Sequence, residues 1–167
     1  MVKVLATDGM APAGVALFET ADGVEIDVHK GVSPDELLTM IPEYDGLIVR
    51  SATTVTPEVM AAATRLKVVG RAGVGVDNVD IKEASRRGIV VMNTPEANTI
   101  STAEHSVAML FSLARRTPEA DATMKQGLWE KKKLKGVELY GKTLGIIGYG
   151  RIGRWVGKIC NAVGMHI

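Results

Sequence analysis

Five short apolar runs alternate with helix-start segments in the first part of the chain, and this alternation most restricts the fold. The runs, each rich in aliphatic or β-branched residues, are residues 2–6, 24–28, 46–50, 67–71 and 88–92. Strands that alternate with helices build a parallel sheet covered by helices on both faces. The sequence therefore predicts an α/β fold whose first unit holds five strands, in an order compatible with a doubly wound sheet.

Three segments carry the residues that begin helices. Ser33 is an N-cap candidate followed by Pro34 and a capping-box Glu36, and Thr56 precedes Pro57 in the same way. Further along, Ser101 and Glu104 have capping-box spacing, and apolar residues recur at helical intervals up to residues 115–116. We predict a long helix there, whose apolar face packs against a sheet or a second subunit.

The residues that leave the strands form the first candidate site. Ligands of an open parallel sheet gather at the carboxyl ends of its strands. Arg50 and Ser51 follow one strand, and the backbone of residues 73–75, Gly-Val-Gly, follows the next. A guanidinium, a hydroxyl and approachable amides suit a carboxylate or phosphate. Taken singly, an arginine at a strand end is more often a surface cation, and Gly-x-Gly is usually only a turn.

A glycine-rich turn forms the second candidate site. The apolar run at residues 144–147 leads into Gly148, Gly150 and Gly153, and a helix-like segment follows. In this context Gly148 permits a tight turn, Gly150 lets a pyrophosphate reach the backbone, and Gly153 allows close packing of helix and strand. The amides of Arg151 and Ile152 would open the helix toward a diphosphate. The sequence thus predicts a strand, a dinucleotide-binding turn and a helix.

Composition argues against several other classes. With 20 basic and 19 acidic residues the net charge is +1, which provides no global field for nucleic acid. The lysines at 131–133 are interpreted as a solvated turn, and no run approaches the roughly 20 apolar residues of a membrane span. Cys160 is the single cysteine, which favours a reducing, cytoplasmic location. His105 has no ligand partners at metal spacing, and we expect no metal site.

Together these stretches resemble the D-isomer-specific 2-hydroxyacid dehydrogenases. The resemblance rests on residues 69–80, on residues 91–95 with Asn98, and on the turn at residues 148–153, and it extends from residue 4 to residue 167. Within the family, residues 47–53 are most similar to the branch that acts on D-3-phosphoglycerate. The resemblance implies a flavodoxin-like parallel-sheet substrate domain over residues 1–97. The truncated start of a Rossmann NAD-binding domain would follow over residues 98–167.

The resemblance also implies a reaction and its site. The expected activity is NAD-dependent oxidation of D-3-phosphoglycerate to 3-phosphohydroxypyruvate, the first step of serine biosynthesis, in a homo-oligomer joined through the NAD-binding domain. The implied substrate-binding residues are Arg50, Ser51, Val74, Gly75 and Asn98, and the implied cofactor-binding residues are Val74, Gly148, Tyr149, Gly150, Arg151, Ile152 and Gly153. Relatives with threonine at position 74 have a hydroxyl that is absent here.

By the same resemblance, the family's catalytic histidine, its partner glutamate and the carbonyl-polarising arginine would lie beyond Ile167. The acidic residue that binds the ribose, expected about 20 positions after the glycines, would also lie there. We therefore expect these 167 residues to be inactive by themselves and to expose apolar surface. Two alternatives stay open: a glyoxylate, hydroxypyruvate or D-lactate reductase of the same family, and an NAD-sensing binding protein like the family's corepressors.

Overall fold

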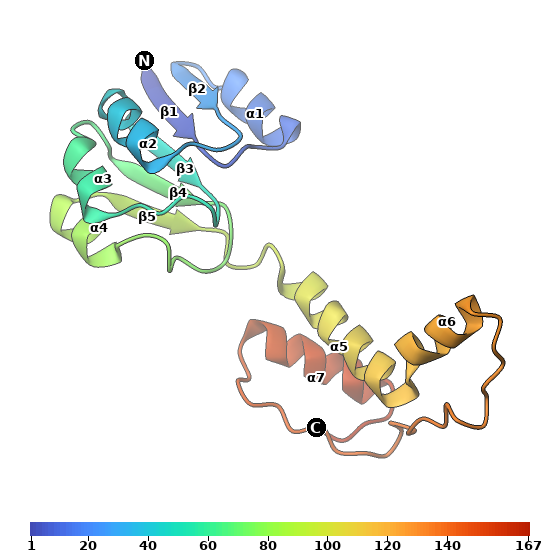
Figure 1. Ribbon diagram of the computed structural model, residues 1–167. Helices are drawn as coiled ribbons and strands as arrows, with labels where there is room; N and C mark the ends of the chain where they lie inside the picture. The colour runs from blue at the N-terminus through green and yellow to red at the C-terminus, as the bar shows by residue number, and fades with distance from the viewer. The chain divides into compact units, whose positions relative to one another are not determined.

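Five parallel strands form a single sheet in the first part of the computed structural model, which describes residues 1–167 (Figure 1). In chain order they are β1 (Val2–Ala6), β2 (Val24–Val28), β3 (Gly46–Val49), β4 (Val68–Arg71) and β5 (Val90–Asn93). Their order across the sheet is β2-β1-β3-β4-β5, so the chain moves out from β1 to β2 and then crosses back to β3. The predicted five-stranded α/β fold and its doubly wound order are confirmed.

The helices of this sheet lie on both of its faces. They are α1 (Pro12–Glu19), α2 (Pro34–Met40), α3 (Pro57–Ala62) and α4 (Ile81–Arg87), with a short 3-10 helix η1 (Ile41–Glu43) after α2. Right-handed crossovers place α1 on one face and α2, α3 and α4 on the other, an arrangement that can be followed in Figure 1. The chain divides into two compact units, residues 1–97 and 98–167.

Both predicted helix caps of the first unit are confirmed. The Ser33 amide donates to Glu36 Oε2 at 2.8 Å, and the Glu36 amide donates to Ser33 Oγ at 3.3 Å, which completes the capping box. Thr56 Oγ1 accepts from the Val59 amide at 3.3 Å at the start of α3. These caps satisfy amides that the first helical turn leaves without partners.

Three strands end or begin at a residue other than the predicted one, and in β4 the difference is only that the strand begins at Val68 instead of Lys67. β3 ends at Val49 because the Arg50 amide donates to Asp8 Oδ2, at 2.7 Å, rather than to a neighbouring strand. β5 begins at Val90 because Gly88 closes α4 in the left-handed conformation, with φ +72°, and delays the return to extended backbone. A glycine adopts this conformation without steric cost.

The core of the first unit lies between the sheet and helices α2, α3 and α4. Leu5, Leu47 and Val69 from three neighbouring strands are almost fully buried in it. The alternate residues of each strand point to the opposite face of the sheet. There Val90 and Met92 of β5 are 57% and 59% exposed, so this strand carries an uncovered apolar strip, whereas Val91 packs on the core.

A buried tyrosine makes the first unit sensitive to alkali. The Tyr44 hydroxyl donates to Asp27 Oδ2 at 2.7 Å, and burial, with that hydrogen bond, raises the pKa of Tyr44 to about 12. Above pH 10 the unfolded chain loses this proton while the folded chain keeps it, so stability should fall between pH 10 and 12. Urea midpoints measured across this range should decline more steeply for the parent than for Tyr44→Phe. Equal slopes would contradict this prediction.

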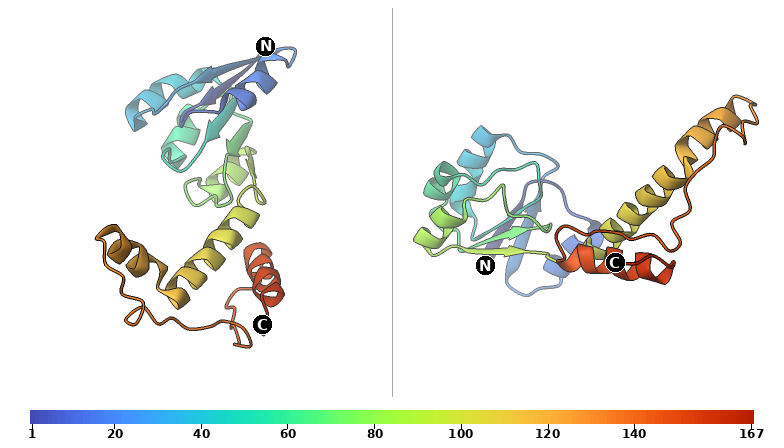
Figure 2. Two further views of the ribbon diagram at one scale, coloured as in Figure 1. Left: turned by 90° about the vertical axis from the view of Figure 1, so that its right-hand side faces the viewer. Right: turned by 90° about the horizontal axis from the view of Figure 1, so that it is seen from below.

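The second unit consists of three helices and long connections. They are α5 (Thr99–Arg115), α6 (Thr117–Lys125) and α7 (Arg151–Ala162). α5 and α7 lie side by side in Figures 1 and 2, and a small core that includes Val107, Cys160 and Met165 joins them. The predicted long helix with one apolar face is confirmed, but this face packs on α7 of the same unit rather than on a sheet. No helix of the structure has both the length and the apolar character needed to cross a bilayer.

Two further predictions for this unit are wrong. α5 begins at Thr99, so Ser101 lies inside its first turn and donates to the Asn98 carbonyl at 3.1 Å instead of capping the helix. The apolar run before the glycine turn forms no strand. Its pairing is limited to a single parallel bridge between Thr143 and His166, which is too short to form a ladder. The lysines at 131–133 lie in an exposed turn, as predicted.

Candidate functional site

The ends of β1 and β3 meet where the sheet changes its direction of winding. Asp8, directly after β1, accepts the amides of Arg50 and Thr53 on its Oδ2 atom, at 2.7 and 3.2 Å. Its Oδ1 atom accepts the Thr53 hydroxyl at 2.5 Å. Open α/β sheets bind ligands at this switch point, outside the carboxyl ends of the strands. The first candidate site therefore lies at the position that the topology favours.

Asp8 is ionised at neutral pH. Partial burial by itself would raise the pKa of Asp8, but hydrogen bonds from the Thr53 hydroxyl and from the amides of Arg50, Thr53 and Ala52 hold it below its ordinary value. The carboxylate thus gathers donors from a loop that follows a different strand. Its negative charge is therefore stabilised by hydrogen bonds from groups of the protein itself.

The loop after β4 is tied to both of its neighbours. The Asn78 side-chain amide donates to the carbonyl oxygens of Arg50 and Thr53, at 2.7 and 2.6 Å. On the other side, Asn93 Nδ2 at the end of β5 donates to the Val74 carbonyl at 2.7 Å. The structure therefore brings the loop that carries Val74 and Gly75 to the same edge of the sheet as Arg50 and Ser51.

The two glycines of this loop have specific neighbours. A Cβ atom at Gly73 would lie 1.5 Å from Arg71 Nη1, and one at Gly75 would lie 2.6 Å from Asp77 Oδ1. Side chains at these positions would displace those groups. Arg50, Ser51 and Gly75 are exposed at this edge, and Val74 is half-buried. The edge thus offers a guanidinium, a hydroxyl and accessible backbone, which together can bind a small anion.

Three residues of this arrangement were not predicted to have a role: Asp8, Thr53 and Asn78. Asn78 lies within residues 69–80, which carry the resemblance, and Thr53 within residues 47–53, but neither of them nor Asp8 is among the predicted site residues. The signal available in the sequence is their position, because each is polar and follows a buried strand. The hydrogen bonds that join Asp8 and Asn78 to Arg50 and Thr53, however, span 25 to 45 residues, and no local pattern identifies them.

Asn98 and the glycine turn belong to the second unit. Asn98 is exposed and precedes α5, where its carbonyl accepts the Thr102 amide at 2.9 Å. Ile152 and Gly153 lie half-buried in α7, and the side chain of Tyr149 is exposed in the turn itself. The predicted cofactor residues from Gly148 to Gly153 are therefore contiguous at one helix N-terminus.

The backbone of the glycine turn has the features that a diphosphate requires. Gly148 has φ +92°, which favours glycine, and a Cβ atom at Gly150 would meet nothing within 4 Å. Gly150 precedes α7, and no side chain caps that helix. A Cβ atom at Gly153 would lie 2.3 Å from the Gly148 carbonyl oxygen, so this glycine is required by packing. The open approach and the uncapped helix terminus fit a dinucleotide pyrophosphate.

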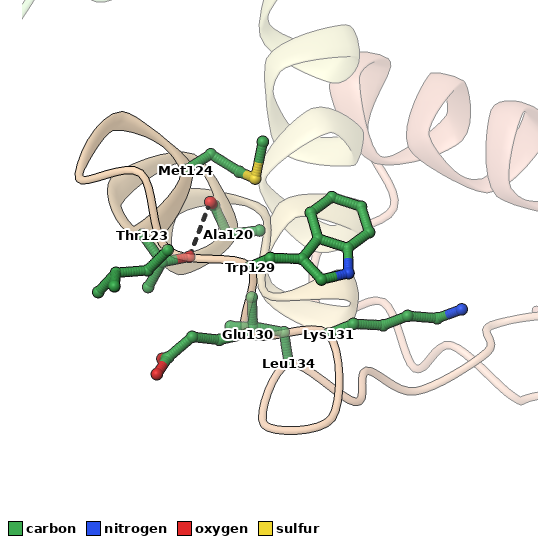
Figure 3. A pocket seen from close by; sticks show the side chains of 8 residues that line it. Ala120, Thr123, Met124, Trp129, Glu130, Lys131 and Leu134 are labelled. Carbon is green, nitrogen blue, oxygen red and sulfur yellow. Dashed lines mark hydrogen bonds between the residues drawn. The ribbon is translucent and has the colours of Figure 1, made fainter.

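A separate apolar hollow of about 350 Å³ lies beside α6. Figure 3 shows its lining side chains, with the Trp129 indole extending from the segment that follows the helix. Trp129 is 77% exposed and Met124 54% exposed. The second unit therefore presents large apolar side chains to solvent.

Comparison with known proteins gives a consistent result along the whole chain. Residues 4–149 match the family profile described as D-isomer specific 2-hydroxyacid dehydrogenase, catalytic domain. The chain is 48% identical over 166 residues to the D-3-phosphoglycerate dehydrogenase of Archaeoglobus fulgidus, which is 99% of this chain and 31% of that protein. It thus spans about a third of the length of the curated relatives it matches.

Solved structures show the same likeness. The TT0316 protein from Thermus thermophilus matches with a TM-score of 0.89 at 38% identity, over 98% of this chain and 54% of that one. The NAD⁺-bound 3-phosphoglycerate dehydrogenase of Entamoeba histolytica matches with a TM-score of 0.76 at 31% identity, over 99% of this chain and 52% of that one.

Proposed function

The chain belongs to the D-isomer-specific 2-hydroxyacid dehydrogenase family, and on this premise we propose that the whole protein oxidises D-3-phosphoglycerate to 3-phosphohydroxypyruvate with NAD. This reaction is the first step of serine biosynthesis, and we place it in the cytoplasm. The observation that carries the proposal is the anion-binding edge at the switch point, in a chain close to half identical to curated D-3-phosphoglycerate dehydrogenases.

The proposed substrate carries a carboxylate and a phosphate, and the proposed contacts suit these two anionic groups. Arg50 and Ser51 supply a guanidinium and a hydroxyl from the loop after β3, and the amides of Val74 and Gly75 supply donors for its carboxylate. The family resemblance adds Asn98 to these proposed contacts. The exposure of Arg50, Ser51 and Asn98 supports this assignment.

The cofactor contacts lie at the start of α7. Gly148, Tyr149 and Gly150 form the turn, the amides of Arg151 and Ile152 bind the pyrophosphate at the helix N-terminus, and Gly153 fixes the helix against the turn. We also assign Val74 to the cofactor site, as the family resemblance implies. When bound, NAD accepts the hydride from the 2-hydroxyl carbon.

The groups that transfer the proton and polarise the carbonyl lie outside these 167 residues in our proposal. His105 is exposed within α5, and His166 is exposed and pairs with Thr143 through its backbone; the family resemblance assigns neither of them to the reaction. Hydride transfer requires a base for the hydroxyl proton. Residues 1–167 expressed alone should therefore show no turnover.

The proposal is tested by assaying the full-length gene product for NADH formation. D-3-phosphoglycerate should support turnover with a kcat/KM at least about tenfold above that for D-lactate, glycerate or glycolate, because only the phosphate adds charge-assisted contacts. A preference for an unphosphorylated acid would identify another dehydrogenase of the family. NAD binding without turnover of any acid would instead indicate a cofactor-sensing protein.

We also propose that a second copy of the chain covers the exposed apolar side chains of the second unit. Trp129 is the anchor, since large aromatic residues contribute most at such interfaces and homo-oligomers are the common assembly. Light scattering of Trp129→Ser should give a lower mass than the parent. Leu17→Ser, which changes a residue that is 72% exposed on α1, is the control and should keep the parent mass. An unchanged mass for Trp129→Ser would contradict the prediction.

A further inference from the structure

We propose that Asp8 and Asn78 are positioning residues, which hold the loop of residues 50–53 in the conformation that binds substrate. The inference rests on the proposed function, because it takes Arg50 and Ser51 as the substrate contacts. Neither Asp8 nor Asn78 needs to touch the substrate itself. Each acts through the backbone of the loop.

Asp8 holds the loop through the backbone N–H groups of the loop residues. Its carboxylate accepts the amides of the first and last loop residues, Arg50 at 2.7 Å and Thr53 at 3.2 Å, and also the Thr53 hydroxyl at 2.5 Å. That hydroxyl lies 2.8 Å from Thr7 Oγ1 and is itself buried. One carboxylate therefore binds both ends of the loop to the end of β1.

Asn78 holds the same two residues by their carbonyl groups. Its side-chain amide has two N–H bonds, and its nitrogen lies 2.7 Å from the Arg50 oxygen and 2.6 Å from the Thr53 oxygen. At the other end of this side chain, Arg71 Nε lies 3.4 Å from Asn78 Oδ1. This contact favours the amide orientation in which the NH₂ group faces the loop.

The loop is thus fixed at residues 50 and 53 from two sides, by side chains that follow two different strands. Ser51 and Ala52, between the fixed ends, stay exposed, as does Arg50. A preorganised loop binds its ligand without first losing conformational freedom. Loss of the hydrogen bonds from either Asp8 or Asn78 should therefore weaken substrate binding, while the glycine turn, in the other unit, keeps its own geometry.

Steady-state kinetics of the full-length protein test this with isosteric variants. Asn78→Asp removes both N–H donors, and Asp8→Asn removes the carboxylate charge. In each we expect the KM for D-3-phosphoglycerate to rise about tenfold or more, with the KM for NAD unchanged within about twofold. Asp27→Asn is the matched control, because it alters a carboxylate of the same unit that binds Tyr44 instead of the loop. It should leave both KM values unchanged.

Arg50→Ala separates this inference from the proposed function. If Arg50→Ala leaves the substrate KM unchanged, the proposed substrate site is wrong. If Arg50→Ala raises that KM but Asn78→Asp and Asp8→Asn do not, only the positioning role is overturned. In the Arg50→Ala background, Asn78→Asp should raise the KM for D-3-phosphoglycerate by less than about a further twofold, because it acts through the same loop.

Independent, multiplicative effects of Arg50→Ala and Asn78→Asp would overturn the positioning role. So would a substrate KM that rises as much in Asp27→Asn as in Asp8→Asn. Melting temperatures are recorded for every variant. If Asn78→Asp does not fold, Asn78→Ala takes its place, since it removes the same donors without adding charge.

Discussion

Replacing Gly153 with alanine should destabilise the second unit by about 2 kcal/mol and weaken NAD binding at least about tenfold. The added Cβ atom would lie 2.3 Å from the Gly148 carbonyl oxygen, and this neighbour is backbone that cannot rotate away. Either α7 or the turn must move. Because the turn shapes the proposed pyrophosphate site, stability and affinity should fall together.

Gly150→Ala is the matched variant for this prediction. A Cβ atom there would meet nothing within 4 Å, so the folded protein should keep its stability within about 0.5 kcal/mol. NAD binding should nevertheless weaken, since the methyl group occupies the approach of the pyrophosphate. Isothermal titration measures the affinity, and the fluorescence of Trp129 and Trp155, both in the second unit, reports its unfolding. Unchanged stability and affinity in Gly153→Ala would refute the packing role of this glycine.

Leu47→Ala should cost the first unit about 3 kcal/mol, within the range of roughly 2–5 kcal/mol for buried leucines. Leu47 is 1% exposed in a central strand and contributes to the core beneath α2 and α3, so its truncation leaves a cavity between rigid elements. The control is Leu17→Ala, at a residue 72% exposed on α1, which should change stability by no more than about 0.5 kcal/mol.

Circular dichroism should report the loss of stability in Leu47→Ala better than tryptophan fluorescence does, because neither tryptophan lies in residues 1–97. A urea midpoint shifted equally by Leu47→Ala and Leu17→Ala would show that the core assignment is wrong. A fluorescence transition shifted as far as the circular dichroism transition would show that the two units unfold together.

The elements predicted correctly are those whose signals are local. The capping box at Ser33 and Glu36 depends on two residues three positions apart, and the glycine turn is contained in residues 148–153. The predicted start of α5 was wrong because the Ser101 and Glu104 spacing satisfies the same pattern from within a helix that already begins at Thr99.

The interactions that the sequence could not predict are those between distant segments. Arg50 lies 42 residues from Asp8 in the chain, and their hydrogen bond both ends β3 and builds the candidate site. Likewise, the apolar character of residues 144–147 indicates a strand, but a strand forms only when a neighbour supplies a ladder. Here the pairing is one bridge, from Thr143 to His166.

The order in which the sheet pairs has a consequence for synthesis of the protein on the ribosome. Every strand of the first unit, and every partner of every strand, is present once Asn93 has been made. This unit can therefore fold while residues 98–167 are still being translated. During that interval the apolar strip of Val90 and Met92 faces the cellular milieu, so this strand is where we expect chaperones to engage the nascent chain.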